Sequence, residues 1–114
     1  MREISCSEIT ENICRMCIQA AHFLSPDMEK TLQQAREKEV SPLGKQILQQ
    51  LQDNLDIAGR DMIPICQDTG MAVFFLELGQ EVHITGGGLE DAVNEGVRKG
   101  YTDMKWLNRR LIHC

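Results

Sequence analysis

The stretch of sequence that decides the fold is Ile63-Pro64-Ile65-Cys66-Gln67-Asp68-Thr69-Gly70-Met71-Ala72-Val73-Phe74. It lies where apolar residues change from three- and four-residue steps to short runs and alternation. The first pattern predicts amphipathic helices, whereas short runs rich in β-branched and aromatic residues predict strands. The chain is therefore expected to be helical before this stretch and to contain strands after it.

Before this stretch, the sequence predicts helices over residues 7–24, 26–39 and 42–59. Ser5 and Glu8 have the spacing of a capping box at the start of the first helix. The other two helices follow the Ser-Pro pairs that begin at Ser25 and Ser41. Serine caps helices well, and proline suits the first helical position. Gly59 is expected to end the third helix.

After it, the sequence predicts a β-hairpin across residues 72–85 and a helix over residues 89–101. Residues 72–78 are the most strand-like run in the chain, Gly79-Gln80 is a turn signal, and residues 82–85 would form the returning strand. The expected fold class is α+β, in which an N-terminal helical layer is followed by a β-hairpin and a helix.

Length and charge limit the classes of function. A chain of 114 residues suits one domain, and its 12 basic and 17 acidic residues give a net charge of −5. The charges are dispersed, which argues against a nucleic-acid surface but does not exclude an anionic substrate. No apolar stretch approaches the roughly 20 residues that span a bilayer, and the N-terminus has no apolar signal core. We expect a cytoplasmic protein with neither a membrane nor a nucleic-acid partner.

The segment best suited to chemistry is Cys66-Gln67-Asp68-Thr69-Gly70. It places a thiol, an amide, a carboxylate and a hydroxyl side by side. Soft thiolates suit iron–sulfur clusters, and a carboxylate beside such a centre can transfer a proton. From composition alone, a surface turn with local side-chain hydrogen bonds is the more ordinary interpretation.

The other cysteines form no obvious metal site. The total of five is odd, and without a secretion signal it favours thiols or metal ligands over disulfides. Cys14 and Cys17 form a C-x-x-C pair, which could bind a metal or act as a dithiol. They lie within a helix on a mostly apolar stripe, so a packing role is expected.

Two further features are weak candidates. Gly86-Gly87-Gly88 precedes a predicted helix, where backbone N–H groups can hold an anion, although a loop without a ligand is the commoner case. His83 alternates with apolar residues in a predicted strand, and no other His or Cys lies two or four positions away. We expect a structural or surface histidine.

The segment from Ile63 to Phe74 resembles the N-terminal cluster segment of class I fumarate hydratases and L-tartrate dehydratase alpha subunits. Two later stretches resemble the same family at the right separation, Gly86-Gly87-Gly88-Leu89 and Ala92-Val93-Asn94-Glu95-Gly96-Val97. The resemblance covers roughly residues 5 to 103, and its Cys-Gln-Asp-Thr-Gly core is quite specific. It favours a functional role for Cys66 over the surface-turn interpretation.

The resemblance implies a hydro-lyase that hydrates fumarate to malate or dehydrates tartrate. Family members hold a [4Fe–4S] cluster through three cysteines and leave one iron open to polarise the substrate. By resemblance, Cys66 is the first of these metal ligands, Gln67 and Asp68 contact a small dicarboxylate substrate, and Asp68 acts in proton transfer. A homo-oligomer is expected, as in the family.

The C-terminal residues depart from the family pattern. Family members continue with a substrate-binding arginine in a Leu-Arg-x-Ser-like run, two more cluster cysteines, and a C-terminal domain or separate beta subunit. Neither Arg109 nor Arg110 aligns with that arginine, and Cys114 lacks the context of a second ligand. We therefore expect residues 1–114 to be the N-terminal portion of a larger fumarase-type alpha domain, inactive alone. They would be either a fragment or the product of a reading frame that ended early.

Two alternatives from other classes stay open. One is a non-catalytic helical interaction domain that derives from the family. The other is a small thiol protein that works through Cys14 and Cys17, which would need an exposed thiol of low pKa.

Overall fold

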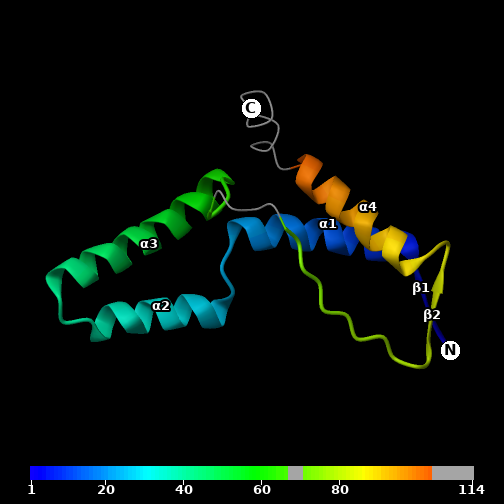
Figure 1. The fold of residues 1–114 in the computed structure, drawn as a ribbon, viewed down its shortest axis with the longest axis horizontal. Coiled ribbons are helices and arrows are strands. Elements are labelled where there is room, and N and C mark those ends of the chain that lie inside the picture. Colours follow the sequence, from blue (N-terminus) through cyan, green and yellow to red (C-terminus); the bar gives the residue numbers. More distant parts are fainter. Residues whose placement is uncertain (67–70, 104–114) are drawn as a thin grey trace. The chain divides into compact units, whose positions relative to one another are not determined.

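The computed structural model describes residues 1–66 and 71–103 of the chain. Two strands and four helices follow one another in this order (Figure 1): β1 (Arg2–Ser5), α1 (Cys6–His22), α2 (Pro26–Lys38), α3 (Pro42–Asp61), β2 (Val82–Thr85) and α4 (Leu89–Asp103). The α+β class predicted from the sequence is confirmed. Within the part that the structure describes, no helix combines the length and apolarity needed to cross a bilayer.

The chain divides into two units, and the first contains Met1–Gln19 together with residues 71–103. In this unit β1 and β2 pair in parallel, with Arg2 opposite Val82 and Ser5 opposite Thr85. Each strand leads into a helix, β1 into α1 and β2 into α4. The unit is thus made of two strand–helix segments that lie side by side and run in the same direction.

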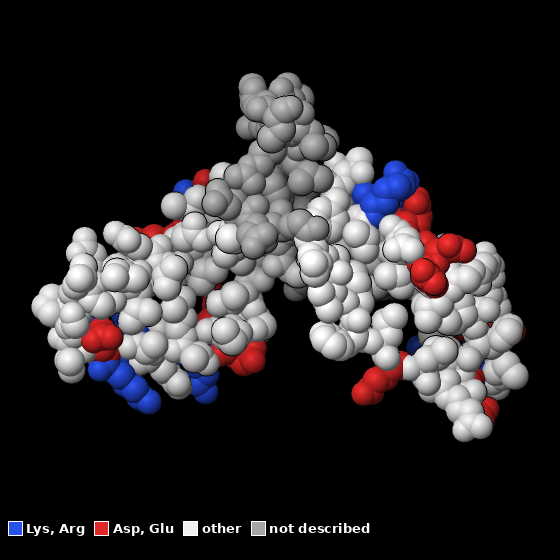
Figure 2. Space-filling view, in the orientation of Figure 1, with Lys and Arg blue, Asp and Glu red and all other residues white. Residues whose placement is uncertain are grey.

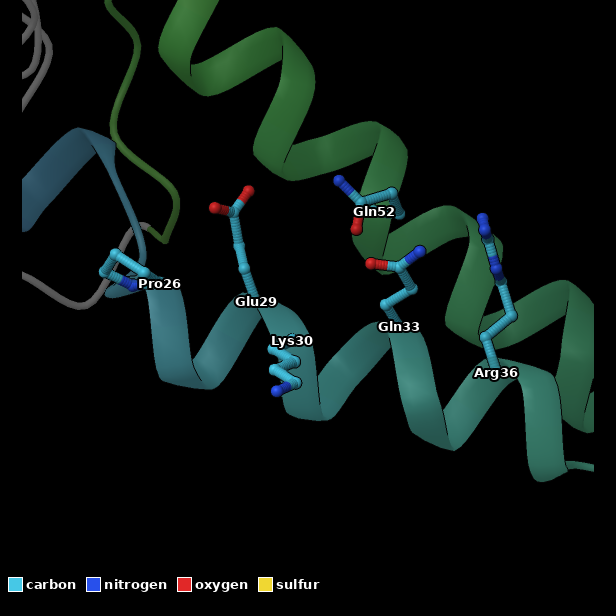
Figure 3. A pocket seen from close by; sticks show the side chains of 6 residues that line it. All are labelled: Pro26, Glu29, Lys30, Gln33, Arg36 and Gln52. Carbon is cyan, nitrogen blue, oxygen red and sulfur yellow. The ribbon is translucent and has the colours of Figure 1, made fainter.

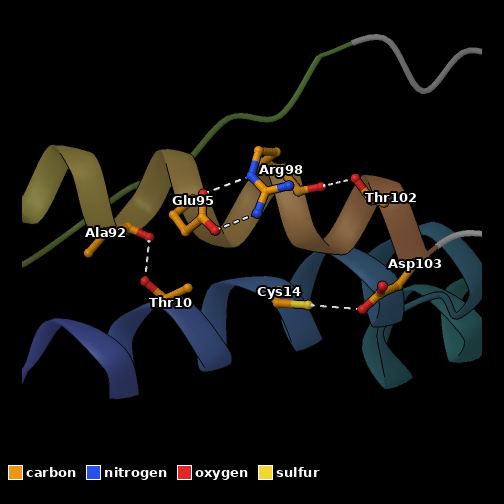
Figure 4. Close-up of polar contacts among 7 residues, drawn as sticks. All are labelled: Thr10, Cys14, Ala92, Glu95, Arg98, Thr102 and Asp103. Carbon is orange, nitrogen blue, oxygen red and sulfur yellow. Dashed lines mark hydrogen bonds and ion pairs between the residues drawn. The ribbon is translucent and has the colours of Figure 1, made fainter.

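Close packing of α4 on α1 depends on two glycines of α4. A Cβ atom added to Gly96 would lie 2.6 Å from the Cβ of Ile13, and one added to Gly100 would lie 2.9 Å from the Cβ of Cys17. Ile13 is only 4% exposed and Thr10 7%. The Thr10 hydroxyl donates a hydrogen bond to the carbonyl oxygen of Ala92 at 2.9 Å, which joins the helices at their buried seam (Figure 4).

The second unit covers residues 20–66 and is built on α2 and α3. These two helices lie antiparallel and are joined by a short connection (Figure 1). Ala58, near the end of α3, is only 2% exposed. Gly59 lies against the ring of Phe23, since an added Cβ atom would come within 2.9 Å of its Cε1.

The predicted helix starts agree with the structure. Ser5 and Glu8 form the capping box, because the Ser5 N–H donates to Glu8 Oε2 and the Glu8 N–H donates to Ser5 Oγ, both at 3.2 Å. At α3, Ser41 Oγ accepts a hydrogen bond from the Gly44 N–H at 3.3 Å. Ser25 precedes α2 without a capping bond from its side chain.

The predicted β-hairpin across residues 72–85 is wrong. A turn is present, since the Val82 N–H donates to the Gly79 carbonyl at 3.1 Å. However, residues 72–78 form no strand, and β2 pairs instead with β1, a strand that the sequence did not predict. Strand propensity marks residues that suit a sheet, whereas tertiary structure decides which segment becomes the partner.

The expected end of the third helix at Gly59 is also wrong. Helix α3 continues to Asp61 and ends where Met62 adopts a left-handed conformation, with φ of 50° and ψ of 49°. The small size of Gly59 serves close packing against Phe23 rather than helix termination.

The apolar stripe of α3 is buried at one end only. The sequence predicts this stripe from Leu43 through Ile47 and Leu51 toward Ala58. Ala58 is buried, whereas Leu43, Ile47 and Leu51 are exposed. The helix predicted from this spacing is confirmed, but most of its apolar stripe is not covered by other described residues.

Candidate functional site

The loop that carries Cys66 leaves the end of α3 through a tight turn. The carbonyl oxygen of Ala58 accepts hydrogen bonds from the N–H groups of Met62 and Ile63, the latter at 3.2 Å. Met62 is the single non-glycine residue with positive φ in the part of the chain that the structure describes. A left-handed residue after the last turn is a common way to stop a helix, and here it redirects the chain toward Cys66.

The residue before Cys66 is held on both sides. The Ile65 N–H donates to the carbonyl oxygen of Ala21 at 2.9 Å, which ties the loop to the end of α1. The Ile65 carbonyl accepts a hydrogen bond from Asn54 Nδ2 of α3, also at 2.9 Å. All of these residues belong to the second unit. Two helices therefore fix the backbone that leads into Cys66.

Cys66 itself is exposed at the end of this anchored loop. Gln67 and Asp68, the predicted substrate contacts, lie outside the described residues. The structure thus places one of the three predicted site residues, and it places the thiol where an external ligand can reach it.

Among the described residues, the exposed thiol of Cys66 is suited to serve as one ligand of an iron–sulfur cluster. A thiolate at an exposed and anchored position is a suitable soft ligand for iron. Across residues 1–66 and 71–103, no group of three His, Cys, Asp or Glu side chains could hold a metal ion. A complete ligand set would need donors from outside these residues.

Cys14 and Cys17 lie in the first unit, where α1 meets α4. The Cys14 thiol donates a hydrogen bond to Asp103 Oδ2, with 3.9 Å between Sγ and Oδ2 (Figure 4). Burial, and then the negative charge of Asp103, raise the pKa of Cys14 above its ordinary value. Burial, and then Cys14, raise the pKa of Cys17. These positions agree with the expected packing role and oppose a reactive dithiol.

The glycine run before α4 has a structural explanation. Gly86 and Gly87 have backbone φ angles of 84° and 150°, which residues other than glycine rarely adopt. The Cys6 thiol donates to the Gly88 carbonyl at 3.7 Å, which ties the run to the start of α1. His83 is an exposed residue of β2, opposite Glu3 in the register. Neither feature shows a ligand site.

A shallow polar groove of about 450 Å³ lies between α2 and α3. Figure 3 shows Glu29, Gln33 and Arg36 reaching from α2 toward α3, where Gln52 faces them. Arg36 donates a hydrogen bond to Gln49 of α3. Opposite charges are mixed along the groove and no cysteine lines it, so its composition does not suit a metal cluster.

Charged side chains are scattered over the described surface. In Figure 2 the acidic and basic groups on the drawn face are interspersed among uncharged residues. The Arg98 guanidinium and the Glu95 carboxylate of α4 form an exposed ion pair at 2.6 Å (Figure 4). No continuous basic surface appears on this face within residues 1–66 and 71–103.

Asn54 of α3 anchors this loop and was not predicted from the sequence. Asparagine is a poor choice for a helix interior, because its short amide competes for backbone hydrogen bonds. The sequence signal that could have indicated this anchoring role is an asparagine in the fourth turn of α3, four positions before the buried Ala58. Its partner, Ile65, could not be identified without the fold.

Comparison with known proteins identifies the family. The model of the fumarate hydratase (fumerase) family matches residues 10–111. The chain belongs to the fumarate hydratase family. No solved structure matches the chain.

Relatives of this fumarate hydratase family member include a fumarate hydratase and subunits of tartrate dehydratase. The chain is 41% identical over 68 residues to the aerobic class I fumarate hydratase of Escherichia coli K12, covering 60% of this chain and 12% of the relative. It is 29% identical over 96 residues to the L(+)-tartrate dehydratase subunit alpha of the same strain, covering 82% and 32%.

A third relative, from Methanocaldococcus jannaschii, is 28% identical over 107 residues, which cover 93% of this chain and 37% of the relative. Its name assigns it provisionally to the L(+)-tartrate dehydratase subunit alpha. The matched regions of these three relatives thus span between an eighth and about a third of their lengths. The family is one of hydro-lyases, and the expected resemblance is confirmed.

Proposed function

We propose that this chain is part of a [4Fe–4S]-dependent hydro-lyase that adds water reversibly to fumarate or removes it from tartrate. The family match supports this assignment, and the Cys-Gln-Asp-Thr-Gly segment falls inside the matched range. The observation that carries the proposal is the position of Cys66. Its thiol is exposed at the end of a loop that α1 and α3 anchor through Ile65.

Each residue of the segment has its own role in the proposal. Cys66 loses its proton and binds iron through its thiolate. Gln67 hydrogen-bonds a carboxylate of the substrate, and Asp68 takes or returns the proton that accompanies loss or gain of water. When bound, the cluster supplies a Lewis acid that polarises the carbon–oxygen bond of the substrate.

The proposed site needs partners beyond these residues. A cluster that leaves one iron open requires three protein thiolates in the manner of the family, and Cys66 supplies one. Cys14 and Cys17 face α4, and their raised pKa values disfavour the thiolate form. We propose that the remaining ligands, and the arginine that pairs with a substrate carboxylate, come from the rest of an alpha subunit. A beta subunit or C-terminal domain would complete the enzyme.

Anaerobic reconstitution tests this proposal directly. The 114-residue chain is incubated with iron and sulfide, and its visible absorbance, iron content, fumarate hydration and tartrate dehydration are measured. The same measurements follow after a family beta subunit and the missing part of an alpha subunit are added. We expect no stable cluster in the chain alone, and both cluster and turnover in the complete assembly.

Two outcomes would contradict the proposal. Robust turnover by the chain alone would show that the ligand set is complete within it. A complete assembly that binds a cluster equally well with Cys66→Ala would show that Cys66 is not a ligand, and would favour a non-catalytic interaction domain. Cys17→Ala is the matched control, because it removes a thiol that packs against α4.

A further inference from the structure

We propose that Asn54 is a positioning residue that sets the orientation of Cys66 by holding the Ile65–Cys66 peptide. This inference rests on the proposed role of Cys66 as an iron ligand. The Ile65 carbonyl, which accepts the hydrogen bond from Asn54 Nδ2 at 2.9 Å, belongs to the same peptide unit as the nitrogen of Cys66. A peptide unit is planar, so holding its oxygen also restricts the direction in which Cys66 leaves it.

The peptide unit before it is held as well. The Ile65 N–H, which belongs to the Pro64–Ile65 unit, donates to the Ala21 carbonyl at 2.9 Å. The proline ring at position 64 also restricts its own φ angle. With successive peptide units each held at one atom, Ile65 has little freedom to rotate. The hydrogen bond from Asn54 holds the last peptide unit before Cys66.

Cys66 lies at the surface, and its side chain is exposed rather than buried in the core. A metal ligand works only when neighbouring groups hold it close to the productive geometry. Asn54 comes four positions before Ala58, whose carbonyl accepts the bonds that end α3. Helix α3 therefore holds the start of the loop through the Ala58 carbonyl and the peptide before Cys66 through Asn54.

An amide at position 54 is chemically specific for this task. The Ile65 carbonyl oxygen can only accept, so its partner must donate. Asn54→Asp keeps the size of the side chain, removes the donor and places a negative charge opposite the carbonyl oxygen. Asn54→Gln keeps the donor on a longer arm. Asn12→Asp is the matched control, because Asn12 Nδ2 donates to the Glu8 carbonyl at 2.8 Å within α1.

The test measures the backbone of the 114-residue chain by NMR and needs no cluster. In Asn54→Asp, the Ile65 amide is expected to exchange its hydrogen about fivefold faster, since a hydrogen bond contributes roughly 1 kcal/mol. The order parameter of the Cys66 N–H is expected to fall from near the rigid value of about 0.85 toward about 0.6. Asn12→Asp should leave both quantities unchanged, and Asn54→Gln should restore most of each.

The outcomes separate this inference from the proposed function. An unchanged Cys66 order parameter in Asn54→Asp would overturn the positioning role, whether or not Cys66 binds iron. Exchange of the Ile13 amide, in the other unit, reports whether a variant has unfolded globally. If Asn54→Asp unfolds, failure of Asn54→Gln to protect Ile65 better than Asn54→Ala would overturn the inference. Failure of the proposed function appears separately, as cluster binding without Cys66.

Discussion

Gly96 of α4 packs against Ile13 of α1 so closely that one added methyl group would lie 2.6 Å from the Ile13 Cβ. The backbone oxygen of Thr10 would also lie within 2.8 Å of that methyl. We expect Gly96→Ala to lower the free energy of unfolding by about 1–3 kcal/mol, because overpacking outweighs the gain in helix propensity of up to roughly 1 kcal/mol. Urea unfolding followed by circular dichroism measures the change.

The matched control for that substitution is Gly44→Ala in α3. The three atoms nearest to an added methyl there all belong to the Glu39 side chain rather than to backbone or core, although its carboxylate accepts hydrogen bonds from the Val40 and Ser41 N–H groups. We expect a change of less than about 1 kcal/mol. If Gly96→Ala stabilised the chain as a simple helix substitution would, the close packing of α4 on α1 would be wrong.

The two Ser-Pro helix starts should respond differently to the loss of their serines. Ser41 Oγ accepts a hydrogen bond from the Gly44 N–H, whereas Ser25 makes no capping bond to its helix. We expect Ser41→Ala to cost about 1 kcal/mol and Ser25→Ala clearly less. Thermal unfolding of the two variants makes the comparison. Equal losses would show that the capping bond of Ser41 contributes nothing measurable.

Cys14 and Cys17 should react slowly with thiol reagents in the native chain. Both are half-buried against α4 and have raised pKa values, so few thiolates are available. We expect alkylation about tenfold or more slower than at the exposed Cys66, as measured by mass spectrometry of the labelled peptides. Labelling of Cys14 at the rate of Cys66 would revive the thiol-protein hypothesis.

The same pKa shifts predict how stability depends on pH. A thiol whose pKa is raised on folding favours the folded state while it is protonated. Its contribution is fully present below the ordinary pKa of 9.0 and is lost as the pH rises through the raised value. The chain should therefore lose stability above about pH 9, and Cys14→Ala should lose less over that range. Urea unfolding at several pH values compares the slopes.

Substitutions in the Cys-Gln-Asp-Thr-Gly segment should separate cluster binding from turnover. In a cluster-loaded assembly that contains this segment, we expect Cys66→Ala to abolish iron retention. Asp68→Asn should keep the iron and lower kcat by about 10²–10⁴-fold, the range for a lost general acid or base. Iron analysis measures retention of the cluster, and steady-state kinetics measure the change in kcat. Loss of iron in Asp68→Asn would contradict the proton-transfer role.

The helices could be predicted from the sequence because their signals are local. The capping box of Ser5 and Glu8 and the Ser-Pro pair at Ser41 lie within a few residues of the helices they start. The partner of β2 could not be predicted in this way. The strand opposite Val82 begins at Arg2, and no local pattern links positions so far apart.

The candidate site could be predicted only in part for a similar reason. The segment that carries Cys66 stands out in the sequence, and it lies within the range that the family model matches. The anchoring of the loop was not readable, because Ala21 and Asn54 reach Ile65 from two different helices. Hydrogen bonds to a backbone carbonyl or N–H leave little trace in the partner's side chain, since every residue but proline offers both groups.

The pairing of β1 with β2 has a consequence for the order in which the chain folds. Thr10 and Ala92, which hydrogen-bond across α1 and α4, are separated by 82 positions, whereas Arg36 and Gln49, which join α2 to α3, are separated by 13. The loss of chain entropy on closing the loop between Thr10 and Ala92 costs roughly 1.6 kcal/mol more free energy than closing the loop between Arg36 and Gln49. During synthesis, β1 leaves the ribosome first but must wait for β2 and α4 before it can pair. The α2–α3 pair is complete much earlier, so we expect it to fold first and the N-terminal strand to join last.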